Sequence, residues 1–225
     1  MRATRWVGAA VVLAGAGWAV GRIARGPARV DIRAFDPDEV ARLERAMWRS
    51  YYDRRRLRLF GQLVALLRGQ FQLSPGRSLA VAFLAARAAA VFQVGRGRAD
   101  YQRALPYLER YYAAILAVSQ TPFDAAEAAR LELEWWIAHR EAAEADHARD
   151  HLQQSLAALA AELYQVPAGR LGVHAERRAE AMTIRDRRSR EPGGVTDADW
   201  ERIEDVLRRS WRSLAAELHA GEPAR

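Results

Sequence analysis

TDADWERIEDVLRRSWRSLAAEL, residues 196–218, is the stretch with the most regular apolar spacing in the chain. Its large apolar side chains recur every three or four residues, at Trp200, Ile203, Leu207, Trp211, Leu214 and Leu218. This spacing places them on one face of an α-helix. Thr196 and Asp199 have the positions of a capping box, which predicts where the helix begins. The stretch therefore predicts an amphipathic helix that packs on other helices.

The same helical spacing recurs upstream of this stretch. Asp36, Pro37 and Glu39 supply an N-cap, a proline in the first turn and an early carboxylate for a helix start. Further helices are expected over residues 36–71 (as one helix or two), 79–94, 100–119, 121–147, 152–163 and 167–189. No convincing β-pattern appears. The predicted fold is all-α, a bundle of six or seven helices in a single domain, 36–220, between a linker, 26–35, and a disordered tail, 221–225.

Residues 79–94 form the most apolar part of this predicted bundle. A central buried helix and a second membrane span both fit the composition. A span needs about 20 apolar residues. Arg87 interrupts this shorter run, and a charge in the middle of a span is costly. We therefore expect a buried core helix.

Composition excludes several classes of chemistry. The 225 residues contain no cysteine, which rules out disulfides, thiolate metal sites and cysteine nucleophiles. All 35 basic residues are arginine, which together with the abundant alanine indicates a GC-rich, bacterial type of genome. Residues 1–34 hold six arginines and one acid, whereas residues 35–225 hold 29 arginines and 27 acids. A nearly neutral domain argues against nucleic-acid binding.

The N-terminal apolar run, residues 6–20, has arginines on both sides. Extended to residues 6–24, it predicts a single-pass membrane anchor, with Trp6 and Trp18 at the two interfaces. A signal peptide cleaved after the small residues 14–16 is the main alternative, and the exported product would then be free of the membrane. Four arginines follow the run and two precede it, which favours a domain on the cytoplasmic side. Residues 1–25 are thus expected to form an anchor or signal segment at the inner (plasma) membrane.

Carboxylates and a histidine gather in the predicted helix 121–147. Glu134 and Glu141 are seven residues apart and share a face, and His139 lies on a neighbouring one. Di-metal sites inside helical bundles use such groups, but they need two Glu-x-x-His pairs. Only one such pair is present, Glu144 with His147. Solvated residues or structural ion pairs therefore explain Glu134, His139 and Glu141 better than a metal does, and no cofactor is predicted.

Arginines interrupt two apolar helix faces. Arg178 and Arg185 do so in the helix 167–189, and Arg87 does so in 79–94. A buried guanidinium needs a carboxylate partner because unpaired burial is strongly destabilising. We therefore predict a buried polar network across the three helices, formed by Arg87, Glu132, Glu134, Glu141, His174, Arg178 and Arg185. Such a network binds an anion or a lipid headgroup. Alternatively, it only sets helix registry, or the arginines reach solvent past short alanines, and these two interpretations are favoured.

Residues 54–58 contain four arginines that suit an anionic lipid surface or simply a solvated helix face, which is the favoured interpretation. No known catalytic motif is present. The expected function is that of a membrane-tethered helical bundle acting without catalysis as a binding, accessory or scaffold protein. Its partner would be another protein or a second copy. The alternative is an enzyme or ligand carrier whose interior carboxylate, histidine and arginine groups bind a metal, a lipid headgroup or a small anion.

Overall fold

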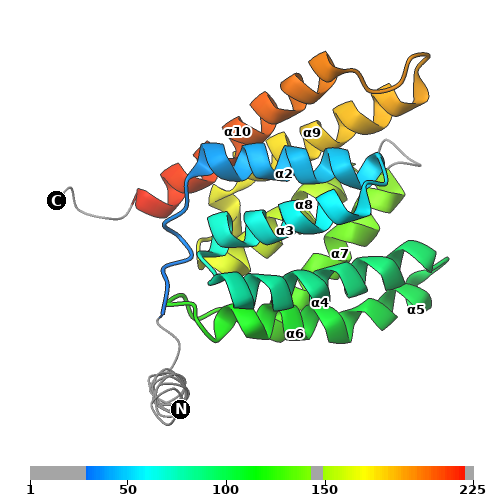
Figure 1. Ribbon diagram of the computed structural model, residues 1–225. Coiled ribbons are helices and arrows are strands. Elements are labelled where there is room, and N and C mark those ends of the chain that lie inside the picture. Colours follow the sequence, from blue (N-terminus) through cyan, green and yellow to red (C-terminus); the bar gives the residue numbers. More distant parts are fainter. Residues whose placement is uncertain (1–28, 143–148, 221–225) are drawn as a thin grey trace, which may run out of the picture.

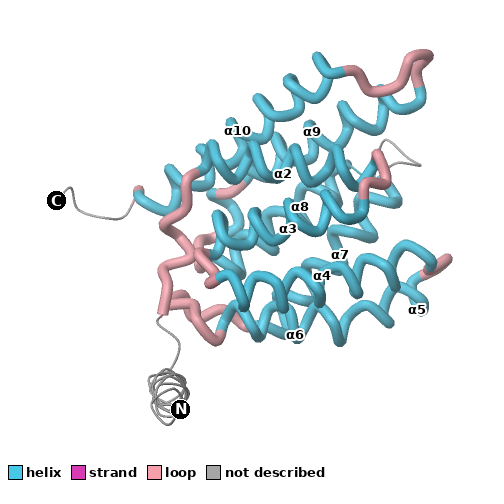
Figure 2. Tube along the Cα trace, viewed as in Figure 1, coloured by secondary structure: helices cyan, strands magenta, loops and turns pink. Residues whose placement is uncertain are grey.

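The computed structural model describes residues 29–142 and 149–220, and the predicted anchor, 1–25, and tail, 221–225, lie outside this part. The described residues form helices joined by loops and contain no strand (Figure 2). The α-helices are α2 (Pro37–Tyr52), α3 (Arg56–Phe71), α4 (Pro75–Val94), α5 (Arg98–Tyr101), α6 (Leu105–Leu116), α7 (Ala125–Ala142), α8 (Arg149–Tyr164), α9 (Gly172–Arg190) and α10 (Asp197–His219). Short 3₁₀ turns occupy Gln102–Ala104 and Ala168–Arg170. The all-α prediction is confirmed for this part of the chain.

The longer helices form a closed ring. Each packs against its neighbours along the chain, α4 packs against α6, and α10 returns to pack against α2. Figure 1 shows α9 and α10 along one side and α4 and α6 along the opposite side, with α2 and α3 in front of α7 and α8. Side chains from all sides fill the middle of the ring, and the main apolar cluster extends from Ile32 to Leu218.

The predicted helix starts at residues 36 and 196 are confirmed. The carboxylate of Asp36 accepts hydrogen bonds from the backbone N–H groups of Asp38 and Glu39. Thr196 and Asp199 form both hydrogen bonds of the capping box. At α7 the cap is Asp124, which accepts from the backbone N–H of Ala126 at 2.8 Å, so the helix begins after residue 124 and not at 121.

The number of helices differs from the prediction. Eight of the described α-helices have at least 12 residues, one more than the upper number expected. The region 36–71 contains two of them, because the chain turns sharply at Arg54, whose φ is 57°. The new direction lets α3 run back along α2 (Figure 1).

α4 is not the central helix that its composition predicts. It lies at the side of the ring between α3 and α6. Only about a fifth (22%) of its most apolar 18-residue stretch is buried. By length and composition it is the one described helix that could cross a membrane. Packing in the core accounts for the apolar residues on one face of α4. The other face is exposed, and we call it the open face of α4.

The expected linker, residues 26–35, is partly folded into the bundle. Val30 donates a backbone hydrogen bond to Val118 at 2.7 Å and accepts one from Gln120 at 2.8 Å. Ile32 is fully buried and Phe35 packs edge-on against Trp211. Residues 30–35 therefore belong to the folded unit, because their apolar side chains complete the core at this end of the ring.

Candidate functional site

A buried ion pair joins α2 and α9 in the middle of the ring. Glu44 is only 1% exposed, and its Oε1 accepts hydrogen bonds from Nη2 of Arg178 at 2.7 Å and from Nε at 3.1 Å. Its Oε2 accepts from Nε1 of Trp211 on α10 at 2.6 Å. Both oxygens of the carboxylate are thus bonded, as a buried charge requires. The pair fixes the relative positions of three helices.

The surroundings of Arg178 keep its guanidinium charged. Burial lowers the pKa of Arg178, but the carboxylates of Glu44 and Glu132 and the hydrogen bonds to Glu44 outweigh it, and the net pKa is raised. The guanidinium carbon also lies 5.3 Å from the ring centre of Trp135 and 5.8 Å from that of Trp211. Contacts between a cation and an aromatic face are favourable when water is excluded. Arg178 is therefore held by charge and by aromatic packing.

Glu132 of α7 has a second set of donors. Its Oε2 accepts from the hydroxyl of Tyr112 on α6 at 2.8 Å, and its Oε1 accepts from Nε1 of Trp136 at 2.8 Å. Burial and the nearby carboxylate of Glu132 raise the pKa of Tyr112 well above its ordinary value, so this tyrosine stays protonated. Glu132 is satisfied by donors of the protein itself.

His174 is buried on α9 and faces α10. Its Nδ1 lies 2.9 Å from Oγ and 3.1 Å from the backbone oxygen of Ser210. A backbone oxygen only accepts, so Nδ1 carries the proton of a neutral ring. Burial, aided by the positive charge of Arg178, lowers the pKa of His174 from 6.5 to about 3. The ring is therefore neutral at physiological pH.

The structure gives the residues weighed as metal ligands other partners. Glu134 forms an ion pair with Arg98 at 3.0 Å, and its other near neighbour is His151, at 3.6 Å. The exposed Glu141 lies 3.9 Å from the same His151 ring. Nε2 of His139 lies 3.0 Å from a carboxylate oxygen of Asp186. Within residues 29–142 and 149–220, no group of three such side chains has an arrangement that could hold a metal ion. The Glu-x-x-His pair, 144 and 147, lies outside these residues.

The two other predicted network arginines also have different partners. Arg87 is exposed, and its guanidinium donates to the hydroxyl of Tyr107 at 3.4 Å and lies against that ring. Arg185 pairs with the adjacent Asp186 at 2.9 Å and stacks on the ring of Tyr52. Of the predicted network, Glu132 and His174 lie near enough to Arg178 for their charges to interact. Arg87, Glu134 and Glu141 lie outside this interior network because their faces meet solvent.

Glu44 is the interior residue that the sequence analysis missed. It has the spacing of an apolar stripe, because Val40 precedes it by four residues and Met47 and Tyr51 follow by three and seven. A carboxylate in phase with such a stripe points into the core. This position is the signal that identifies the partner of Arg178.

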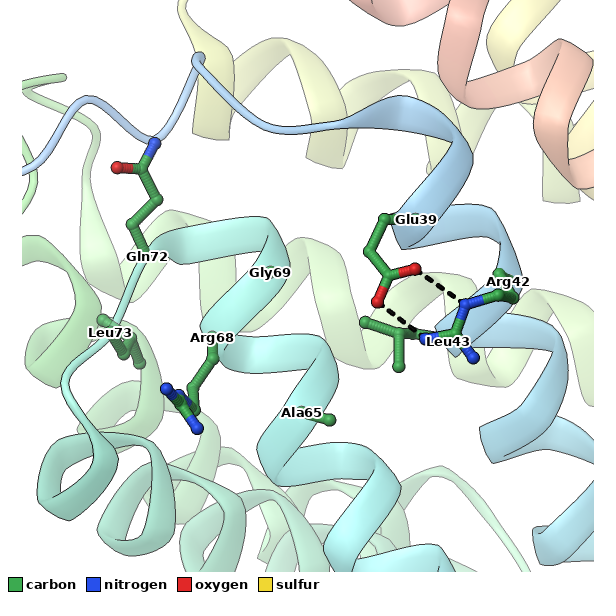
Figure 3. Close-up of a pocket in the computed structure, with 8 residues that line it drawn as sticks. All are labelled: Glu39, Arg42, Leu43, Ala65, Arg68, Gly69, Gln72 and Leu73. Carbon is green, nitrogen blue, oxygen red and sulfur yellow. Dashed lines mark hydrogen bonds and ion pairs between the residues drawn. The ribbon is translucent and has the colours of Figure 1, made fainter.

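Two surface hollows are lined by arginines. The larger, of about 500 Å³, lies between α2 and α3, with the doubly bonded Glu39–Arg42 pair on the α2 side and Arg68 on the α3 side (Figure 3). The smaller, of about 210 Å³, is lined by Arg45, Ala46, Arg49, Ser50, Asp53, Arg55, Arg58 and Gln62. Arg45, Arg49 and Arg55 pair with Glu204, Asp197 and Asp53, respectively. The protein's own acids thus neutralise much of the positive charge at both hollows.

Comparison with known proteins finds no matching family model, no matching curated protein and no matching solved structure. A function for this chain therefore has to come from its own residues and their geometry. The interior polar groups bond mainly to one another, and the surface offers shallow hollows and the open face of α4.

Proposed function

We propose that this chain is a membrane-tethered helical bundle that acts without catalysis, as a binding, accessory or scaffold protein. Residues 6–24 anchor it in an inner (plasma) membrane, and the bundle lies on the cytoplasmic side. Its partner is another protein or a second copy of the chain. The uninterrupted apolar run, 6–20, and the excess of arginines after it support this placement.

The attachment of Val30 to the bundle is the observation that carries the proposal. Two backbone hydrogen bonds hold Val30 beside Val118 and Gln120, after the end of α6. Only residues 25–29 separate this point from the end of the apolar segment, and they span at most about 20 Å when fully extended. An anchor joined so closely holds the bundle against the bilayer, which is the geometry that a membrane scaffold needs.

The interior supports binding over catalysis. Glu44, Arg178 and Trp211 satisfy one another, as do Glu132 and its two donors. A ligand in the ring would have to break buried pairs, and that is costly. This favours helix registry as the role of the interior charges.

Flotation of the full chain with lipid vesicles tests the tether. We expect the protein to float with vesicles in high salt and in alkaline carbonate, and to leave them only in detergent. Val12→Arg puts a charge in the apolar run and should shift the protein to the soluble fraction, whereas Ala3→Arg, before the run, is the matched control. Wild-type protein that stays soluble without detergent would refute the tether.

Metal content and the ultraviolet–visible spectrum test the second half of the proposal. The full chain, purified in detergent, is expected to show neither stoichiometric metal nor a chromophore. Stoichiometric metal or a bound chromophore would overturn the scaffold and favour an enzyme or carrier.

A further inference from the structure

α4 presents an apolar face that no other described helix covers. Leu79 is 53% exposed, Phe83 59% and Val94 78%. The same face includes the exposed alanines Ala80, Ala86 and Ala90. The spacing of three or four residues places these side chains along one side of the helix. Soluble proteins rarely expose a continuous apolar stripe of this kind unless something binds to it.

Arg87 lies halfway along this face, and its guanidinium points toward α6. Its guanidinium donates to the hydroxyl of Tyr107 on α6 and lies 5.5 Å from the centre of that ring. The long side chain therefore turns toward α6, at the edge of the stripe. An arginine at the border of an apolar surface is well placed to reach a headgroup.

The hairpin of α3 and α4 is free of acids. Residues 54–99 contain nine arginines and no aspartate or glutamate, whereas the rest of residues 35–225 holds 20 arginines and 27 acids. The domain is almost neutral overall because the net positive charge of this hairpin is nearly balanced by the net negative charge of the other helices and loops. Apolar side chains bordered by arginines are the pattern of a segment that lies in the interface of an anionic bilayer.

The chain enters the bundle at this hairpin. Gln72, in the turn between α3 and α4, donates from Nε2 to the backbone oxygen of Asp31 at 2.9 Å. The segment that follows Arg29 meets the end of the ring where α4 begins (Figure 1). The apolar run, 6–20, precedes this point, so a bilayer that holds the run lies close to Leu79 and Phe83.

We propose that the open face of α4 lies on the surface of a bilayer that contains anionic lipid. Leu79, Phe83 and Val94 enter the acyl boundary, and Arg87 at the border of the face contacts headgroups. A second copy is a poorer occupant, because two acid-free hairpins would repel each other. This inference rests on the proposed membrane tether and adds which face of the bundle meets the lipid.

Site-directed spin labelling tests the face directly, and the cysteine-free chain needs only one substitution for each label. Phe83→Cys and, as the control on α10 at the opposite side, Ala216→Cys are labelled in the full chain. Both positions are exposed, so neither change disturbs the core. In vesicles of phosphatidylglycerol and phosphatidylcholine, the label at 83 should gain oxygen collisions and lose collisions with a water-soluble nickel chelate. The label at 216 should keep aqueous values.

Other outcomes overturn the inference and separate it from the tether. If the protein floats with vesicles while the label at 83 stays exposed to water, the membrane tether is supported and the contact of the α4 face with lipid is refuted. Spin–spin coupling between labels at 83 without anionic lipid would mean that a second copy covers α4. A label at 83 that is immobilised without lipid in a single copy would mean that the chain covers its own face.

A Val12→Arg background isolates the face when the tether is removed. This variant should still associate with anionic vesicles at low salt, and should lose that association in high salt or with Phe83→Asp added. Ala216→Asp is the matched control and should leave the association unchanged. Equal binding by the two aspartate variants would overturn the inference even if the tether holds.

Discussion

Nη2 and Nε of Arg178 both donate to one oxygen of Glu44, at 2.7 and 3.1 Å, although 134 residues separate the two in the chain. The pair ties α2 to α9, and Trp211 of α10 binds the other oxygen. The buried charges thus help to close the ring. Removing one member leaves the other without a partner in a medium where water is scarce.

Glu44→Gln should therefore destabilise the bundle strongly. Breaking a buried ion pair by neutralising one partner costs about 3–5 kcal/mol, and each kcal/mol lowers the melting temperature by about 2–4 °C in a domain of this size. Thermal unfolding followed by circular dichroism measures the change. Glu201→Gln, an exposed carboxylate on α10, is the control and should leave the melting temperature nearly unchanged. Equal melting of the two variants would show that the pair does not stabilise the fold.

Glu132→Ala should cost much more stability than Glu134→Ala. The first change leaves the donors of Tyr112 and Trp136 without an acceptor, and each unsatisfied buried donor lowers the stability by about 1–3 kcal/mol. The second removes an ion pair with the exposed Arg98, which is worth at most about 1 kcal/mol. Urea unfolding of both variants measures the difference. A larger loss of unfolding free energy for Glu134→Ala would show that Glu134, and not Glu132, is the carboxylate of the interior network.

His174 should make the bundle sensitive to acid. Between pH 6.5 and about 3 the unfolded chain binds a proton at this ring that the folded chain does not bind, so stability falls as the pH falls. The slope from this one group approaches about 1.4 kcal/mol per pH unit. His174→Asn should flatten the profile of unfolding free energy from pH 6 to 4. Parallel profiles for wild type and His174→Asn would contradict the prediction.

Ile32→Ala tests whether residues 30–35 belong to the folded unit. The side chain is fully buried, and truncating a buried isoleucine costs about 2–5 kcal/mol. Val173→Ala removes an apolar side chain that is more than half exposed and serves as the control. Denaturant unfolding of the two variants gives the comparison. If both variants unfold like the wild type, residues 30–35 are a linker after all.

Local patterns determined the helices. The spacing of Trp200, Ile203 and Leu207 and the capping box at Thr196 specify α10 through contacts three or four residues apart. The same kind of signal predicted α2 from Asp36. The division between α2 and α3 was left open, because a turn at one residue with positive φ has no pattern of its own.

The tertiary structure alone decided which side chains meet. The sequence showed that Arg178 requires a carboxylate, because an unpaired buried guanidinium is too costly. Its partner is Glu44, 134 residues away, and only the closure of the ring brings them together. The open face of α4 has the same cause: apolar composition is a property of the chain, whereas exposure depends on which helices pack beside it.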